Sequence, residues 1–229
     1  YLIVGEGNAG VTWADTIRAH RQDGTMALIS HEEYLMYSLV LFPNYIKKRI
    51  KREQVFLRTT EDFGKNRITL MLGKTVTLLD TQKNTLHVGH GETYTYDKLL
   101  IASGGTPQSF GVMDEKRDGV FHLQTIDDAD HILHFLPRAE KMLVVGSSFI
   151  SLEFLEIGHV HHIHTTLLAR DKYFFGKALD ETGGLVLQKN CEKMGIETSF
   201  KQHVTAIEGD EVATGLRAIS GKTYEGNMI

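Results

Sequence analysis

The sequence Tyr1-Leu-Ile-Val-Gly-Glu-Gly-Asn-Ala-Gly10 places an apolar run directly before three glycines in the spacing G-x-G-x-x-G. The residues that follow, Val11 to His20, can continue as a helix, so the pattern predicts a strand, a tight turn and a helix. In such a unit Gly5 permits the turn, Gly7 lets the backbone approach a pyrophosphate, and Gly10 lets strand and helix pack closely. The free N–H groups at the start of the helix then suit a diphosphate. The stretch therefore predicts a dinucleotide-binding unit.

A glycine triplet can also be a plain structural turn, and the next residues favour the dinucleotide. A second predicted strand, Thr25 to Ile29, follows the helix, and Glu32 lies just beyond it. Glu32 comes twenty-two residues after Gly10. This is close to the spacing at which a carboxylate accepts a hydrogen bond from a ribose hydroxyl.

Composition describes an ordinary globular protein and excludes some partners. The 229 residues are 41% hydrophobic and 24% charged, with a formal net charge of -4. Nucleic-acid-binding surfaces are usually strongly basic, so no nucleic-acid partner is expected. The one basic cluster, residues 47–52, is interpreted as a solvated face rather than a polyanion site. We see no apolar run that could span a bilayer and no signal peptide, so no membrane partner is expected.

Cysteine usage points to a reducing compartment. Cys191 is the only cysteine, so a disulfide within the chain cannot form. We expect a cytoplasmic location for this reason. Cys191 itself lies in a late predicted helix and is expected to act as a small buried hydrophobe.

The second half of the chain repeats the organisation of the first. A predicted strand, Lys141 to Val145, runs into Gly146, a helix follows, and another strand spans Thr165 to Ala169. This second fingerprint has lost two glycines, because Ser148 and Ser151 stand in their places. Serine fits a turn but keeps a ligand further from the backbone, so weaker dinucleotide binding is expected here.

Between the two fingerprints the pattern predicts an antiparallel β-meander over 75–96 and a buried strand over 97–102. The segment 34–46 is too apolar for a solvent loop and contains Pro43, so it should lie against a flavin or the neighbouring core. A turn-rich stretch over 108–119 suggests the domain boundary. The fold class predicted is α/β, with two Rossmann-like three-layer (ββα/βαβ) domains, 1–112 and 113–229.

Several motifs, in order along nearly the whole chain, resemble one family: the FAD-dependent pyridine nucleotide oxidoreductases of the NADH oxidase, rubredoxin reductase and nitrite reductase type. The motifs are Gly5 to Gly10, Met36-Tyr-Ser-Leu-Val40 with Leu41-Phe-Pro-Asn-Tyr-Ile46, Tyr96-Asp-Lys-Leu-Leu-Ile-Ala-Ser-Gly104, Thr125-Ile-Asp-Asp-Ala129 and Val144-Val-Gly-Ser-Ser-Phe-Ile-Ser-Leu-Glu153.

The resemblance implies a first domain holding FAD and an inserted second domain holding NAD(P)H, with hydride passing to the flavin and electrons passing on to a redox protein or dioxygen. The residues it assigns to FAD are Gly5, Gly7, Asn8, Ala9, Gly10, Glu32 for the ribose, Tyr37 and Ser38 over the flavin, Val76 at the adenine, and Ala102, Ser103 and Gly104. Those it assigns to the nicotinamide nucleotide are Gly146, Ser148, Phe149, Ile150 and Glu153. It implies a homodimer through a C-terminal domain, and we expect the chain to be incomplete at that end, with Gly226-Asn227 beginning the return to the flavin domain.

Departures from the family pattern sharpen these expectations. Disulfide-active members carry a cysteine beside the flavin, where this chain has Leu39 to Leu41, so disulfide reduction is not expected. Leu39 also replaces the family's arginine.

At the end of the strand 165–168 the family often has an acid, and here Ala169 and Arg170 stand. An arginine there pairs well with a 2′-phosphate, which favours NADPH, although a plain surface arginine is the alternative.

We identify no catalytic side chain and no metal site from the sequence. His159, His161, His162 and His164 cluster, but without an acidic or cysteine partner at a metal-ligand spacing. His162 stands where a helix-ending glycine is usual, so a left-handed conformation is expected. Two alternatives to the enzyme stay open. One is an FAD-binding electron-relay subunit of a larger complex with a vestigial nicotinamide site, and the other is a non-catalytic relic.

Overall fold

Two units divide the chain in the computed structural model, which describes residues 1–89, 91–107 and 117–229. One unit comprises Tyr1–Leu39 and Lys51–Thr106, and the other Val40–Ile50 and Pro107–Ile229. The expected boundary between residues 112 and 113 lies outside the described residues. Among the described residues, Val40–Ile50 and Pro107 belong with the second unit, whereas the expected division placed both in the first domain.

A four-stranded parallel sheet forms the middle layer of the first unit, in the order β3-β2-β1-β7. The first fingerprint supplies β1 (Leu2–Val4), which pairs with β2 (Ala27–Ile29) and with β7 (Leu99–Ile101), and β3 (Thr69–Met71) is the edge strand beside β2. β1 therefore lies between two parallel neighbours, and the glycine turn follows its carboxyl end, where ligands bind in sheets of this kind.

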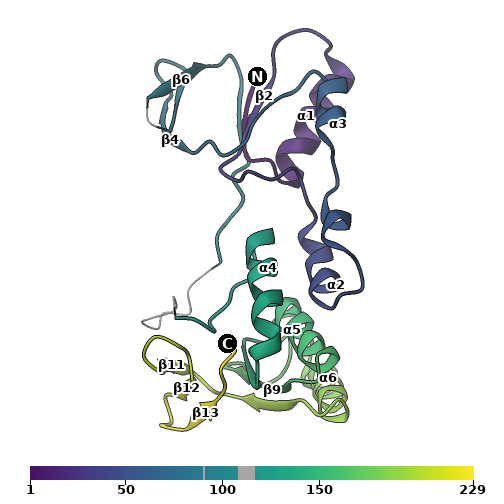
Figure 1. Cartoon of the computed structure of the whole chain (residues 1–229), viewed down its shortest axis with the longest axis vertical. Coiled ribbons are helices and arrows are strands. Elements are labelled where there is room, and N and C mark those ends of the chain that lie inside the picture. Colours follow the sequence, from purple (N-terminus) through teal and green to yellow (C-terminus); the bar gives the residue numbers. More distant parts are fainter. Residues whose placement is uncertain (90, 108–116) are drawn as a thin grey trace. The chain divides into compact units, whose positions relative to one another are not determined.

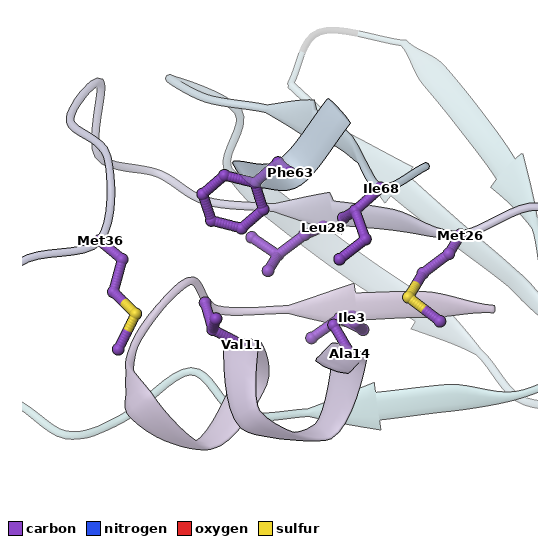
Figure 2. Close-up of a cluster of buried hydrophobic side chains, with 8 residues drawn as sticks. All are labelled: Ile3, Val11, Ala14, Met26, Leu28, Met36, Phe63 and Ile68. Atoms are coloured by element: carbon purple, nitrogen blue, oxygen red, sulfur yellow. The ribbon is translucent and has the colours of Figure 1, made fainter. Parts of the chain in front are cut away.

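Helices and the meander cover the two faces of this sheet (Figure 1). On one face lie α1 (Asn8–His20) and α3 (Thr60–Lys65), preceded by the short 3-10 helix η2 (Arg52–Val55). Their shared core is drawn in Figure 2 and consists of Ile3, Val11, Ala14, Met26, Leu28, Met36, Phe63 and Ile68. On the other face β4 (Val76–Asp80), β5 (Thr85–Val88) and β6 (Glu92–Thr95) form the predicted antiparallel meander, which packs through Leu2, Ile29, Leu86 and Val88.

The second unit has the same three layers. A parallel sheet in the order β10-β9-β8 is built from β8 (Lys141–Val145), β9 (His164–Ala169) and β10 (Glu197–Phe200). An antiparallel sheet of β11 (Val204–Glu208), β12 (Gly215–Ala218) and β13 (Thr223–Glu225) shares a core with it that includes Leu143, Leu168 and Leu216. The helices are α4 (Ile126–Phe135), the 3-10 helix η3 (Leu136–Arg138), α5 (Phe149–Val160) on β8 and β9, and α6 (Glu181–Lys193) beside β10.

These layers confirm the predicted fold class of two Rossmann-like units with an antiparallel meander. In each unit, an apolar strand, a glycine turn and a helix form one local element. Among the described residues, no helix is both long enough and apolar enough to cross a membrane.

The apolar segment 34–46 is not simply a loop. The 3-10 helix η1 (Leu39–Leu41) leads into the helix α2 (Phe42–Ile46), which packs on α4 and α5. Pro43 stands in the first turn of α2, where its missing N–H breaks no helical hydrogen bond. Phe42 and Ile46 are fully buried, so this part of the segment contacts the protein's own core.

The C-terminal residues also differ from expectation. Met228 pairs in parallel with Met142 of β8, and the Leu143 N–H donates to the Met228 carbonyl at 2.7 Å. Ile229 exchanges backbone hydrogen bonds with Gly119 and Phe121. The prediction that Gly226-Asn227 begins a return to the first domain was wrong, because residues 227–229 pair within the second unit.

Candidate dinucleotide sites

In the first fingerprint, two glycines are required by the protein's own backbone. Gly5 has φ +107°, and a Cβ placed on it would lie 2.1 Å from the Ala102 carbonyl oxygen. A Cβ on Gly10 would lie 2.0 Å from the Gly5 carbonyl oxygen. Contacts this short are forbidden, so the turn after β1, the turn after β7 and the start of α1 pack against one another only with glycine at both positions.

Gly7 is different, because nothing in the described protein requires it to be glycine. Its backbone is extended, with φ -68° and ψ -177°, and no atom lies within 4 Å of where its Cβ would be. A side chain there would occupy open space beside the start of α1. This is the space that a pyrophosphate needs if it is to contact the backbone, so the geometry fits a diphosphate group.

The start of α1 is also left without a side-chain cap. Gly7 occupies the N-cap position with no side-chain hydrogen bond, whereas Thr125 caps α4 and Asp180 caps α6. Within the described residues, the first-turn N–H groups of Asn8 and Ala9 have no side-chain acceptor, so they can donate to an anion.

Glu32 and Tyr37, which the resemblance assigned to two different parts of FAD, form one pair. The Tyr37 hydroxyl donates to Glu32 Oε2 at 2.5 Å. The backbone of Glu32 is fixed as well, since its N–H donates to Ser30 Oγ and its carbonyl accepts from the Gly73 N–H. Sequence reasoning did not reveal this link, because a five-residue separation in a loop does not determine whether two side chains meet.

The remaining residues assigned to FAD lie on three further segments of the first unit. Ser38 is held by its N–H, which donates to the Val55 carbonyl at 2.8 Å. Ala102 continues β7 by donating to the Val4 carbonyl at 2.7 Å, and Gly104 follows it with φ +70°. Val76 opens β4 on the meander and packs beside the cluster that contains Ile29. Gly5 thus lies in direct contact with both Gly10 and Ala102, and Glu32 contacts Tyr37. Val76 lies on the meander, and no contact links it to these residues in the described part of the chain.

Glu6 is a residue of this loop that sequence reasoning missed. Its side chain is buried, and Oε1 has no hydrogen-bond partner among the described residues. The pKa of Glu6 is raised from 4.5 to about 7, and burial is the largest cause. The hydrogen bond from the Met36 N–H lowers this pKa, and the charge of Glu32 raises it further. An acid between two glycines of a predicted dinucleotide turn was the signal that could have identified it.

The second fingerprint keeps the turn and changes the packing. Gly146 has φ +119°, and its N–H donates to the Leu168 carbonyl at 2.8 Å. Ser148 is the N-cap of α5 and makes no side-chain cap bond, so this helix start is also open to an anion. Ser151, which replaces the third glycine, is buried, and its Oγ lies 3.5 Å from Ser148 Oγ. The helix therefore accommodates a side chain where Gly10 of the first unit cannot.

An apolar surface surrounds the start of α5. Phe149 is 73% exposed and Ile150 is 57% exposed. The Phe149 ring lies against that of Phe175, with centroids 4.4 Å apart. Phe175 is tied to the glycine turn, since its N–H donates to the Ser147 carbonyl, and Ser147 Oγ donates to Asp171 Oδ2 at 2.5 Å.

Glu153 belongs to an ion-pair network within the second unit. Lys47 Nζ lies 3.3 Å from a Glu153 oxygen and 2.5 Å from one of Glu156, and Arg49 pairs with Glu156 at 2.9 Å. The Lys47 side chain is only 3% exposed. The hydrogen bond from Lys47 lowers the pKa of Glu156. The interpretation of residues 47–52 as a solvated face was therefore wrong for Lys47.

At the end of β9, Ala169 is buried and Arg170 is exposed. In the described part of the chain the Arg170 guanidinium makes no hydrogen bond and no ion pair. A cation without a partner at this strand end is available to an anionic ligand.

The histidines near β9 have structural contacts. His161 donates to the Ile46 carbonyl, His159 contacts the Met194 carbonyl, and His164 lies 3.3 Å from a Glu197 oxygen. His162 has φ +57°, which confirms the expected left-handed conformation. Over residues 1–89, 91–107 and 117–229, no three His, Cys, Asp or Glu side chains form a metal-binding group. Cys191 is buried as expected, and burial raises the pKa of its thiol.

Two glycine turns, each between a parallel strand and an uncapped helix start, are typical of α/β proteins that bind dinucleotides. The family model for pyridine nucleotide-disulphide oxidoreductase matches residues 1–229. The chain belongs to this family.

Three similar proteins illustrate the family. An NADH oxidase of Methanocaldococcus jannaschii is 28% identical over 100% of this chain and 52% of its own length. Putidaredoxin reductase, in a covalent complex with putidaredoxin, superposes with a TM-score of 0.94 at 23% identity, over 99% of this chain and 56% of its own. An engineered water-forming NADPH oxidase bound to NADPH superposes with a TM-score of 0.93 at 18% identity, over 99% of this chain and 52% of its own. The chain thus spans about half the length of these relatives.

Proposed function

We propose that this chain holds FAD on its first unit and NAD(P)H on its second, as part of a flavoprotein oxidoreductase. The enzyme would take hydride from NAD(P)H and pass electrons to a redox protein or dioxygen. The observation that carries the proposal is the open space at Gly7. The fold does not require glycine at this position, but a diphosphate that contacts the backbone does. Family membership and the names of the similar proteins support the same reading.

On the first unit, the N–H groups of Asn8 and Ala9 would bind the FAD diphosphate beside Gly5, Gly7 and Gly10. Glu32, oriented by Tyr37, would accept from the adenosine ribose. Val76 would border the adenine, and Ser38 together with Ala102, Ser103 and Gly104 would contact the rest of the cofactor. When bound, the flavin supplies the chemistry of accepting a hydride and releasing electrons.

On the second unit, the turn at Gly146 and the start of α5 at Ser148 would bind the NAD(P)H diphosphate. Phe149 and Ile150 present apolar surface that suits a nicotinamide ring, and this role accounts for two large apolar side chains left exposed in the first turn of a helix. Glu153, half exposed and fixed by Lys47, would lie toward the nicotinamide end.

We further propose that NADPH is the preferred donor. Ala169 lacks the carboxylate that would repel a 2′-phosphate, and the Arg170 guanidinium has no partner among the residues that the structure describes. The engineered NADPH oxidase carries an aspartate-to-alanine change followed at once by alanine-to-arginine, and a glycine-to-alanine change eighteen positions earlier. This chain has Ala169 followed by Arg170, and the non-glycine Ser151 eighteen positions before Ala169.

The acceptor, the assembly and the location form the remaining part of the proposal. A redox protein acceptor is supported by putidaredoxin reductase, whose structure holds its putidaredoxin partner. A homodimer would form through a C-terminal domain of the family type. A cytoplasmic location accords with a single, buried thiol.

Anaerobic spectroscopy on the full-length protein tests the enzyme proposal. The purified protein should show the flavin absorption bands, and NADPH added without oxygen should bleach them within a turnover time. A protein that binds no flavin would overturn the proposal.

One alternative is favoured by a specific observation. Ser148 and Ser151 replace two glycines of the second fingerprint, so the chain could belong to an FAD-binding electron-relay subunit with a vestigial nicotinamide site. In that case FAD binds, but neither NADPH nor NADH bleaches it.

A further inference from the structure

Glu6 is a buried carboxyl group inside the loop that is proposed to hold the FAD diphosphate. It stands between Gly5 and Gly7, is 7% exposed, and leaves Oε1 without a hydrogen-bond partner among the described residues. Folded proteins leave few buried polar atoms unpaired. A glutamate in this place is also unnecessary for the turn, because Gly5 and Gly10 already set its geometry.

The surroundings of Glu6 disfavour a negative charge. The segment after β2 presents the charged side chain of Glu32, which acts on Glu6 as a like charge, and the Met36 N–H, which opposes it. Tyr37 on that segment donates its hydroxyl to Glu32. The turn after β7 packs on the adjacent Gly5 through Ala102 and Ser103, which are uncharged. The positive end of α1 favours ionisation but is a modest effect. Burial is the larger one, and it brings the pKa of Glu6 to about 7.

We propose that Glu6 couples cofactor binding to protonation: when a diphosphate binds beside Gly7, the Glu6 carboxylate takes up one proton from solvent. The inference rests on the proposed function, because it requires a dinucleotide at the glycine loop. The reason is electrostatic, since the added negative charges of the diphosphate further disfavour an ionised carboxylate in the same buried loop. The proton comes from the buffer, and no bond to the cofactor is formed or broken.

The coupling has a measurable consequence for affinity. At pH 8 the free protein would hold Glu6 mostly ionised, so FAD binding must draw in a large part of a proton. By linkage, FAD affinity then falls by up to roughly tenfold for each pH unit above the pKa of the free protein. Below that pKa, Glu6 is already protonated and affinity levels off.

Calorimetric titration of the full-length apoprotein with FAD tests this directly. At pH 8.0 the binding enthalpy is compared in HEPES and in Tris, whose ionisation enthalpies differ, so the difference reports the protons taken up. We expect about half a proton or more for the wild-type protein and close to none for Glu6→Gln, which has the same shape but cannot titrate. Glu33→Gln, which removes the exposed carboxylate next to Glu32 in the sequence, should keep the wild-type value.

The outcomes separate the two proposals. Wild-type FAD binding without proton uptake, or an uptake that persists in Glu6→Gln, would overturn the role of Glu6 and leave the proposed function standing. If the variant fails to fold, the wild-type titration still tests the proposal, since binding without proton uptake overturns it. No FAD binding by the wild-type protein would overturn the proposed function and this role together.

Discussion

The hydroxyl of Tyr37 donates to the carboxylate of Glu32 across a loop, at 2.5 Å, and so ties the proposed ribose-binding acid to the proposed flavin-covering segment. A hydrogen bond to a carboxylate fixes the orientation of that carboxylate. Glu32 is therefore held in one orientation before any ligand arrives, as its proposed contact with the ribose requires.

Tyr37→Phe removes this hydrogen bond while keeping the ring that packs on Phe56. We expect the FAD dissociation constant to rise roughly threefold to tenfold, because bonds to charged groups contribute about 1.5–3 kcal/mol and water can partly replace this one. Fluorescence titration with FAD measures it. Tyr96→Phe, on the meander, is the matched control and should change the constant less than about twofold. Equal effects in both variants would show that the Tyr37 hydroxyl does not organise the site.

Gly7→Val should lose FAD binding but keep its stability, whereas Gly10→Ala should lose stability. Valine at position 7 meets open space, so unfolding free energy should change by less than about 1 kcal/mol, yet FAD binding should be lost. Alanine at position 10 meets the Gly5 carbonyl, so it should destabilise the fold by more than about 3 kcal/mol. Urea denaturation and the flavin content of the purified variants measure the two effects. Stoichiometric FAD in Gly7→Val would refute the position of the diphosphate.

Arg170→Ala should separate the two nicotinamide cofactors. If the guanidinium binds the 2′-phosphate, the Michaelis constant for NADPH should rise roughly tenfold or more, and that for NADH should change less than about twofold. Steady-state reduction of an artificial acceptor measures both. Lys172→Ala, an exposed cation two residues on, serves as the control. The same rise for both cofactors in Arg170→Ala would rule out recognition of the 2′-phosphate.

The stability of the apoprotein should depend on pH through Glu6. The folded pKa of about 7 lies above the ordinary 4.5, so the folded state binds this proton more tightly than the unfolded chain. The resulting stabilisation is present below pH 4.5 and is lost as the pH rises through about 7. The full difference is about 3 kcal/mol.

Glu6→Gln cannot ionise, so between pH 5 and pH 8.5 it should gain up to about 3 kcal/mol of unfolding free energy relative to wild type. Urea denaturation at the two pH values gives this difference. If the wild type and Glu6→Gln lose stability in parallel, Glu6 is not the group responsible.

The amino-acid sequence determined the local elements and their order. The strand into Gly5 and the helix after Gly10, their second copy at Gly146, and the meander between them follow from short-range sterics and hydrophobic periodicity, which a sequence shows directly. Thr125 as the cap of α4 is a local pattern of the same kind. Thr59, which caps α3, is another such local pattern.

Only the tertiary structure decided which of these elements meet. Lys47 looked like part of a solvated basic run, but α2 packs on α5 and places it beside glutamates more than a hundred residues away in sequence. In the same way, the Met36 N–H, which is distant in sequence, donates to Glu6, and Met228 pairs with Met142 of β8. Charge and burial at a site are sums over neighbours that are distant in sequence, whereas a turn depends only on its own few residues. The glycine motif could therefore be predicted from the sequence, but the acid inside it could be understood only from the fold.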